Sequence, residues 1–312
     1  MKLVAQIRAG SPQAEQIRAQ YPDVEVIELT DGDPPADLKA DAFFGGYMQW
    51  DVILRWLDAT EVDWVQLTGT GIDNVPSAAF DGRTVTCARG ASAIPISEWA
   101  MAALLAWAKR MPETFLSEPP KYWNFPNPPL DRIEGSRLAI VGLGGIGTAI
   151  ATRALAFGMH VRALRRTDAP SPIEGVEVVT SLDALLDGAD HVVLAAPATA
   201  RTRHLIDADA FAKMKPGVHL VNIARGGLVD QDALRVALDD GTVAMATLDT
   251  VEPEPLPSGH WLYSHPKVRL AAHISWYTPD LQRAAFEILL ENIGRYLKQE
   301  PLLHVVDLDE GY

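Results

Sequence analysis

The stretch that decides the fold is residues 138–147, which read LAIVGLGGIG. Its first four residues have the character of a buried strand, and the glycines lead into a helix-like segment, residues 148–157. The first glycine permits a tight turn, the second lets the backbone approach a pyrophosphate, and the third lets helix and strand pack closely. N–H groups at a helix start attract anions. The pattern predicts a dinucleotide-binding unit, and a glycine-rich turn without a ligand is the alternative.

The cofactor is expected to contact every residue of this loop: Gly142, Leu143, Gly144, Gly145, Ile146 and Gly147. The end of the next predicted strand, residues 160–165, decides which nucleotide is preferred. NAD-specific proteins carry there a carboxylate that hydrogen-bonds the ribose hydroxyls. This chain carries Arg165 and Arg166 instead, and guanidinium groups match a phosphate well. The sequence therefore predicts that NADP is preferred and that NAD can also be used. The alternative is that Arg165 and Arg166 are solvated surface residues without a role in cofactor choice.

Outward from the loop, short apolar strands alternate with helical patterns in both directions. A long apolar helix, residues 94–109, and a proline-rich stretch, residues 111–131, separate two such series. This alternation is typical of α/β proteins with parallel sheets. We expect two Rossmann-like or flavodoxin-like βαβ domains with the active-site cleft between them. The predicted domains are a discontinuous substrate-binding (catalytic) domain, residues 1–93 and 281–312, and a dinucleotide-binding domain, residues 94–280.

Length and charge limit the classes of partner. The 312 residues correspond to two domains at about 150 residues each. A balance of 27 basic against 41 acidic residues gives a net charge of −14, which opposes binding to nucleic acid and to anionic membranes. We therefore predict neither a nucleic-acid nor a membrane partner.

The cysteine content and the first residues bear on the compartment. A single cysteine, Cys87, excludes an internal disulfide and a cysteine-based metal cluster, and we expect no metal site. The start, Met1–Gly10, lacks the apolar region of a signal peptide, and no run approaches about 18 uncharged apolar residues. A cytoplasmic location is the simplest expectation.

Three further segments place polar residues directly after predicted strands. Arg225 follows one strand, Asp249 and Glu254 follow the next, and His273 follows the third. The carboxyl ends of parallel strands lie at one edge of a sheet, where ligands bind. We expect these side chains beside the glycine loop.

With the glycine loop, these segments resemble the D-isomer-specific 2-hydroxyacid dehydrogenase family, which includes glyoxylate/hydroxypyruvate reductases and D-lactate, D-glycerate and phosphoglycerate dehydrogenases. The resemblance covers nearly the whole chain. It rests on four motifs in the family's order: residues 142–147, residues 221–230, the Asp249–Glu254 segment and His273. It implies an NAD(P)-dependent oxidoreductase that interconverts a D-2-hydroxy acid and its 2-oxo acid, such as glyoxylate or hydroxypyruvate.

The resemblance also implies a role for each residue of the catalytic set. Arg225 would grip the substrate's carboxylate and keto oxygen, His273 would be the acid/base, and Glu254 its carboxylate partner. These types suit the reaction, because imidazole exchanges protons near neutral pH and a guanidinium supports a growing oxyanion. A structural histidine and a surface ion pair are the alternatives.

Other site residues are carried over from the same resemblance. Those expected at the cofactor are Ala196, Pro197, Ala224 and Asp249, the last as acceptor for the nicotinamide carboxamide. Those expected at the substrate, besides Arg225, are Tyr47, Met48, Thr70, Gly71 and Trp276. A plain turn at residues 70–71, a turn residue at Asp249 and ordinary core packing of the aromatic rings are the alternatives. Because the loop around Tyr47 offers no further cation, monocarboxylic 2-oxo acids are expected over dicarboxylates.

The proline-rich stretch, with Tyr122 and Trp123, resembles the family's segment that embraces a second subunit, so a homodimer is expected. A monomer whose arm folds back is the alternative. Fold alone does not prove catalysis. The alternative functions are a nucleotide-sensing binding scaffold of the same fold and a dehydrogenase of the formate or phosphite type.

Overall fold

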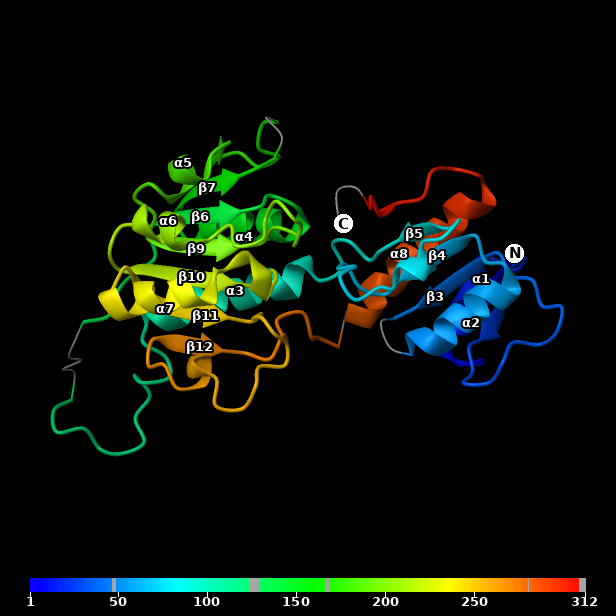
Figure 1. Cartoon of the computed structure of the whole chain (residues 1–312), viewed down its shortest axis with the longest axis horizontal. Helices are drawn as coiled ribbons and strands as arrows, with labels where there is room; N and C mark the ends of the chain where they lie inside the picture. Colours follow the sequence, from blue (N-terminus) through cyan, green and yellow to red (C-terminus); the bar gives the residue numbers. More distant parts are fainter. Residues whose placement is uncertain (47–48, 124–128, 167–168, 280, 309–312) are drawn as a thin grey trace. The chain divides into compact units, whose positions relative to one another are not determined.

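The computed structural model describes residues 1–46, 49–123, 129–166, 169–279 and 281–308. The chain forms two compact units, Met1–Ser92 with Thr278–Tyr312, and Ala93–Tyr277. The sequence-based prediction places the two domain boundaries after residues 93 and 280. Each unit is a parallel sheet with helices packed on it (Figure 1), which confirms the predicted α/β class of two Rossmann-like or flavodoxin-like units.

The smaller unit is built on a sheet with the strand order β2-β1-β3-β4-β5, and all its pairings are parallel. This is the order of flavodoxin-like sheets. An antiparallel bridge, Thr86 to Val305, adds the C-terminal tail beside β5. The strands are β1 (Lys2–Ala5), β2 (Glu25–Glu28), β3 (Ala42–Gly45), β4 (Trp64–Leu67) and β5 (Thr84–Thr86).

Helices cover both faces of this sheet. On one face, α2 (Trp50–Thr60) buries Ile53 and Leu57 against Phe43 and Val65. On the other, α1 (Pro12–Gln20) and α8 (Leu281–Leu297) pack against β1. The last helix therefore completes the core of the first strands, and this is why the unit needs both ends of the chain. A short 3-10 helix, η1 (Ser77–Ala79), precedes β5.

The larger unit has the strand order β12-β11-β10-β9-β6-β7-β8, again parallel throughout. The chain starts in the middle at β6, moves to β7 and β8, and then crosses to β9 on the other side of β6. Ligands bind where the order reverses in this way, outside the carboxyl ends of the strands. The strands are β6 (Arg137–Val141), β7 (His160–Leu164), β8 (Val176–Val179), β9 (His191–Leu194), β10 (Val218–Asn222), β11 (Val243–Leu248) and β12 (Val268–Leu270).

Two apolar clusters lie on the two faces of this sheet. The first is covered by α3 (Ala93–Ala108) and α4 (Gly145–Ala156), which pack against each other, so α3 is apolar on most of its surface. The second lies beneath α5 (Leu182–Leu186), α6 (Ala208–Ala212) and α7 (Gln231–Asp240). The 3-10 helices η2 (Gly226–Leu228) and η3 (Trp261–Tyr263) lie in loops of the same unit.

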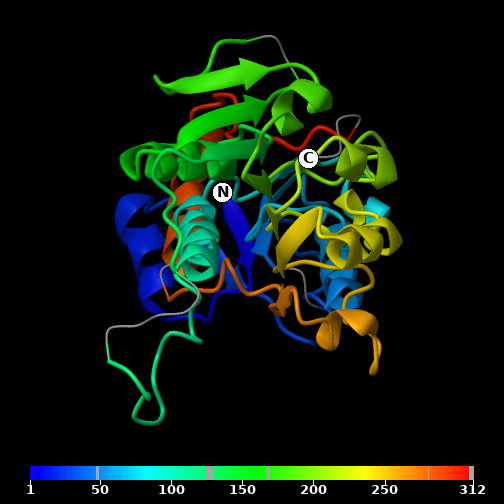
Figure 2. The same ribbon diagram turned by 90° about the vertical axis from the view of Figure 1, so that its left-hand side faces the viewer.

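The segment between α3 and β6 leaves the body of the larger unit. Residues 111–123 form turns without helix or strand, and both views show them projecting outward (Figures 1 and 2). Several of their large apolar side chains face solvent, among them Phe115, Leu116, Tyr122 and Trp123, which is 74% exposed.

Candidate active site of the larger unit

The turn from β6 into α4 fits a pyrophosphate. The N-cap of α4 is Gly144, which supplies no side-chain hydrogen bond, and N–H groups in the first helical turn have no partner within the helix. A Cβ atom built on Gly144 would meet nothing within 4 Å. The helix start is therefore open to a ligand and has donors to offer it, which is what a nucleotide pyrophosphate requires.

Two further glycines of the loop, Gly142 and Gly147, are required by the protein's own packing. Gly142 has a φ of 97°, and a Cβ on it would lie 2.9 Å from Ala195 O and from Ala196 Cα. A Cβ on Gly147 would lie 2.0 Å from Gly142 O. Leu143 is buried, and Ile146 packs against the same core. The loop after β9, which continues from Ala196 to Pro197, thus lies against the glycine turn.

Arg165 directly follows β7, the second strand of the βαβ unit formed by β6, α4 and β7, and thus lies at the carboxyl end of that strand. Its Nη1 donates to Pro170 O at 2.9 Å and to Ala169 O at 3.5 Å, and these contacts hold the guanidinium at the strand end. Arg166 beside it is exposed. Both arginines therefore occupy the position at which a carboxylate would select NAD.

His273 and Glu254 form a hydrogen-bonded pair. His273 Nδ1 lies 2.8 Å from Glu254 Oε2, and Glu254 Oε1 accepts from the Val251 N–H at 3.0 Å. Partial burial would raise the pKa of Glu254, but the hydrogen bonds from His273 and Val251 and the charges of His273 and Arg225 together lower it. An ionised Glu254 accepts only, so Nδ1 carries the proton. Nε2 is then the ring nitrogen that can exchange a proton with a substrate.

The backbone of His273 adopts a left-handed conformation, with a φ of 54°. Its N–H donates to Asp249 O at 2.8 Å. The buried Asp249 carboxylate also accepts from the next two N–H groups, Ile274 at 2.8 Å and Ser275 at 3.2 Å. These bonds hold a conformation that is uncommon for residues other than glycine. Asp249 thus anchors the loop after β12, and its expected contact with the nicotinamide stays a prediction.

Arg225 lies in the loop after β10, between the buried Ala224 and the 3-10 helix η2. Its side chain is half-buried, and its Nη1 donates to Ala224 O at 2.8 Å. Its charge contributes to the lowered pKa of Glu254. The loops after β10, β11 and β12 therefore bring Arg225, Glu254 and His273 together, as expected for strands that end at one edge.

Glu252, two residues before Glu254, has a different partner. Arg203 Nη1 lies 3.1 Å and 3.3 Å from its two carboxylate oxygens. Glu252 therefore pairs with an arginine, and Glu254 is the carboxylate that contacts His273.

The residues expected at the substrate are placed less fully. Thr70 and Gly71 lie in the smaller unit in the loop after β4, where Thr70 Oγ1 donates to Ala88 O at 3.1 Å. Trp276 packs against the apolar cluster beneath α3 and α4, so core packing explains part of its surface. Tyr47 and Met48 lie outside the described residues. The substrate roles of all five stay predictions.

Two residues without a role in the sequence-based site help to shape it. Asn222 ends β10 with a buried side chain that bonds to Arg225 O, and Gly226 lies against the backbone of Val251. The sequence feature that could have indicated Asn222 is an amide at the end of an otherwise apolar strand. For Gly226 the sequence offers only its position next to Arg225.

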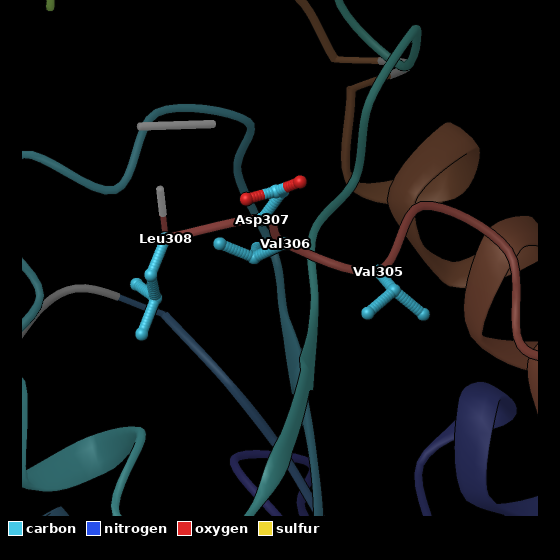
Figure 3. Close-up of a pocket in the computed structure, with 4 residues that line it drawn as sticks. All are labelled: Val305, Val306, Asp307 and Leu308. Atoms are coloured by element: carbon cyan, nitrogen blue, oxygen red, sulfur yellow. The ribbon is translucent and has the colours of Figure 1, made fainter. Parts of the chain in front are cut away.

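A hollow of about 640 Å³ lies elsewhere, at the C-terminal tail. Its lining, drawn in Figure 3, is Val305, Val306, Asp307 and Leu308. It contains none of the predicted site residues. Within the described residues, there is no group of three or more His, Cys, Asp or Glu suited to a metal ion, and no helix is long and apolar enough to cross a bilayer.

Comparison with known families agrees with this geometry. The model of the "D-isomer specific 2-hydroxyacid dehydrogenase, NAD binding domain" matches residues 101–275, more than half of the chain. The chain belongs to the D-isomer-specific 2-hydroxyacid dehydrogenase family. The matched residues lie within the larger unit, so the glycine loop and the His273–Glu254 pair belong to the family's NAD-binding domain.

Individual members of the D-isomer-specific 2-hydroxyacid dehydrogenase family align over most of the chain. Hydroxypyruvate reductase of Thermotoga maritima is 36% identical over 236 residues, which cover 73% of this chain and 76% of that protein. D-3-phosphoglycerate dehydrogenase of Methanocaldococcus jannaschii is 35% identical over 77% of this chain, but the match covers 46% of that protein. This chain thus spans about half the length of several curated relatives.

Solved structures of the family extend the likeness to the whole chain. A D-isomer specific 2-hydroxyacid dehydrogenase from Xanthobacter autotrophicus Py2, in complex with NADPH and MES, has a TM-score of 0.80 at 27% identity. The alignment covers 100% of this chain and 99% of that one.

Proposed function

We propose that this protein is an NAD(P)-dependent oxidoreductase that interconverts a D-2-hydroxy acid and its 2-oxo acid. The observation that carries the proposal is the His273–Glu254 pair, 2.8 Å apart, in the NAD-binding unit of this family. A scaffold that only senses nucleotides needs the glycine loop but has no need of a proton donor held in this way.

The residues of the site divide the chemistry between them. When bound, the nicotinamide nucleotide supplies a hydride to C2 of the 2-oxo acid or accepts it from the 2-hydroxy acid. Arg225 offers a planar fork to the substrate's carboxylate and positive charge to the oxygen on C2. His273 donates the Nε2 proton to that oxygen during reduction and takes it back during oxidation. Glu254 keeps the imidazole in the required tautomer and orientation through Nδ1.

The cofactor is proposed to be NADPH in preference to NADH. Arg165 and Arg166 support this proposal, because both lie where the 2′-phosphate of the adenosine ribose would be recognised. The solved structure from Xanthobacter autotrophicus also contains NADPH.

The proposed substrates are small or medium-sized monocarboxylic 2-oxo acids, with glyoxylate and hydroxypyruvate as the first candidates. A relative of similar length is named hydroxypyruvate reductase. Arg225 is the proposed ligand of the substrate carboxylate within the larger unit, and Thr70 and Gly71 stay candidates by resemblance to the family alone. If oxaloacetate or 2-oxoglutarate gave the highest kcat/KM, this substrate class would be wrong.

The test is a panel of 2-oxo acids, each assayed with NADPH and with NADH by absorbance at 340 nm. We expect turnover with NADPH, and His273→Ala should lose about 10²–10⁴-fold in kcat while its nucleotide affinity, measured by fluorescence titration, stays near that of the parent. Nucleotide binding without turnover on any acid would favour the scaffold function. Turnover on formate or phosphite alone would favour the other dehydrogenase type.

A second copy of the chain is the proposed partner. The projecting residues 111–123 expose Phe115, Leu116, Tyr122 and Trp123, an apolar surface typical of association sites. Light scattering of the purified protein should give the mass of a dimer, and Trp123→Glu should shift the equilibrium toward the monomer. A monomeric parent at micromolar concentration would contradict the proposal.

A further inference from the structure

The side chain of Asn222 joins two of the catalytic loops. It is 1% exposed, and its Oδ1 accepts from the Ala224 N–H at 3.1 Å. Its Nδ2 donates to Arg225 O at 2.9 Å and to Thr250 O at 3.4 Å. One amide thus connects the loop that carries Arg225 with the end of β11 that leads to Glu254.

The same two loops meet at Gly226. A Cβ atom built there would lie 1.9 Å from the carbonyl carbon of Val251 and 2.4 Å from the Glu252 nitrogen. The backbone conformation of Gly226 does not require glycine, so the need is for space alone. The Val251 N–H is in turn the donor that holds Glu254.

A continuous set of contacts therefore runs through the site. It leads from Arg225 O through Asn222 to Thr250, along the backbone to Val251, and from the Val251 N–H through Glu254 to His273. A shift of the arginine loop against β11 would change the distance between the guanidinium and the imidazole.

We propose that Asn222 is a positioning residue that sets the spacing between Arg225 and the Glu254–His273 pair. The inference rests on the proposed function of Arg225 as the group that binds the 2-oxo acid. The acid must reach Arg225 and His273 at once, and a misplacement of about 1 Å can cost about 10²-fold in rate. Loss of the amide should therefore reduce turnover and substrate affinity while leaving the nucleotide loop intact.

Asn222→Asp is the sharpest variant. The two side chains have the same shape, and the new carboxylate keeps an acceptor for the Ala224 N–H. Its other oxygen, however, would face the carbonyl oxygens of Arg225 and Thr250 instead of donating to them. At pH 8 we expect kcat/KM for the best 2-oxo acid to fall about 10- to 100-fold with a raised KM, and the Kd for NADPH to stay near that of the parent.

The pH profile separates positioning from mere stability. Burial and two facing carbonyl oxygens raise the pKa of the introduced carboxyl, and in its protonated form it can donate to one of them again. The ratio of variant to parent kcat/KM should therefore rise as the pH is lowered from 8 to 6. Because protonation would also restabilise the fold, parent and variant are compared well below the melting temperature measured at each pH, where a variant that only folds less well would keep the parent's kcat/KM.

A matched control is available in the smaller unit. Asn292 is also fully buried, and its Nδ2 donates to Gln66 Oε1 at 2.8 Å and to Leu303 O at 3.2 Å, while its Oδ1 accepts from the Leu303 N–H at 2.8 Å. Asn292→Asp should lower the melting temperature yet keep the parent's kcat/KM well below that temperature. If Asn222→Asp does not fold, Asn222→Ser, which brings one hydroxyl donor and no charge, replaces it.

Arg225→Ala and the double variant Arg225→Ala/Asn222→Asp complete the experiment. If Asn222 acts through Arg225, the double variant should be no slower than Arg225→Ala alone. Full additivity, or a parent-like kcat/KM in the folded Asn222 variant, would overturn the positioning role while leaving the proposed function intact. A fully active Arg225→Ala would overturn the proposed function itself.

Discussion

Two buried histidines should make the larger unit sensitive to acid. His191 is the first residue of β9 and His219 the second residue of the adjacent strand β10. Their rings lie 5.8 Å apart, and Trp107 packs against both. Their Nδ1 atoms have no hydrogen-bond partner among the described residues, and His219 Nε2 lies 2.8 Å from Thr247 Oγ1. Neither ring can gain a proton without placing a charge in this apolar site.

The pKa values give the sign and the size of the effect. Burial lowers the pKa of His191 to about 4, although Asp190 raises it and Lys215 lowers it further. Burial, His191 and Arg269 also hold the pKa of His219 well below its usual range. Between pH 6.5 and 4 the unfolded chain therefore binds more protons than the folded one, so stability falls as the pH falls. At 1.36 kcal/mol per pKa unit, His191 alone accounts for a loss of about 2 kcal/mol by pH 5 and about 3 kcal/mol in total.

The assay is urea unfolding of the parent and of His191→Leu at pH 8, 6.5 and 5. The free energy of unfolding of the variant should fall less between pH 8 and pH 5 than that of the parent, by about 2 kcal/mol. His160→Leu is the control, because it removes an exposed imidazole from the first residue of β7, which β6 separates from β9 in the same sheet, and should keep the parent's pH dependence. Equal pH dependence in the parent and in His191→Leu would refute the reasoning.

Three further predictions concern the site. The parent should prefer NADPH over NADH by about tenfold to a thousandfold in kcat/KM, because a charge-assisted hydrogen bond contributes about 1.5–3 kcal/mol to binding and less where it is exposed to solvent. Arg165→Asp should reverse much of this preference. A variant that keeps the preference would show that cofactor choice is made elsewhere. Glu254→Gln should lower kcat by about 10²-fold with little change in nucleotide affinity, because the charge beside the imidazole is lost and one of the two accepting oxygens becomes an amide NH2. Unchanged kcat would remove Glu254 from the mechanism. Gly147→Ala, whose Cβ would lie 2.0 Å from Gly142 O, should lower the melting temperature, whereas Gly144→Ala should keep it and weaken NADPH binding. Calorimetry measures the melting temperature and titration the NADPH affinity. A lowered melting temperature in Gly144→Ala and weaker NADPH binding with an unchanged melting temperature in Gly147→Ala would contradict the division of roles in the glycine loop.

Local motifs allowed much of the catalytic set to be predicted. Residues 138–147 specify a strand, a tight turn and the start of a helix, with glycines that tolerate no other side chain at two of the positions. Arg225, Glu254 and His273 each follow a strand of the same sheet, and parallel strands end at one edge. The expected placement of these residues needed only short-range patterns and one rule about sheet direction, whereas the role of each residue was implied by the resemblance to the family.

Elements that depend on distant neighbours were harder to predict. The strand β8 (Val176–Val179) lies at the edge of the sheet after a proline-containing loop, and its short pattern does not distinguish it from a turn. The pairing of His191 with His219 is likewise invisible in a one-dimensional pattern. Twenty-eight residues separate them in sequence, and only the register of β9 with β10 makes them neighbours.

The sequence by itself determined the α/β class and predicted the nucleotide-binding turn, because both depend on residue types at short, fixed spacing, and the resemblance to the family added the proposed proton donor and its partner. Only the tertiary structure decided how these parts are held. The buried Asn222 amide, the close approach at Gly226 and the Asp249 carboxylate against the His273 loop all join segments far apart in the chain. Such contacts arise when neighbouring strands bring their loops to one edge, and no local pattern of residues records which backbone groups will then meet.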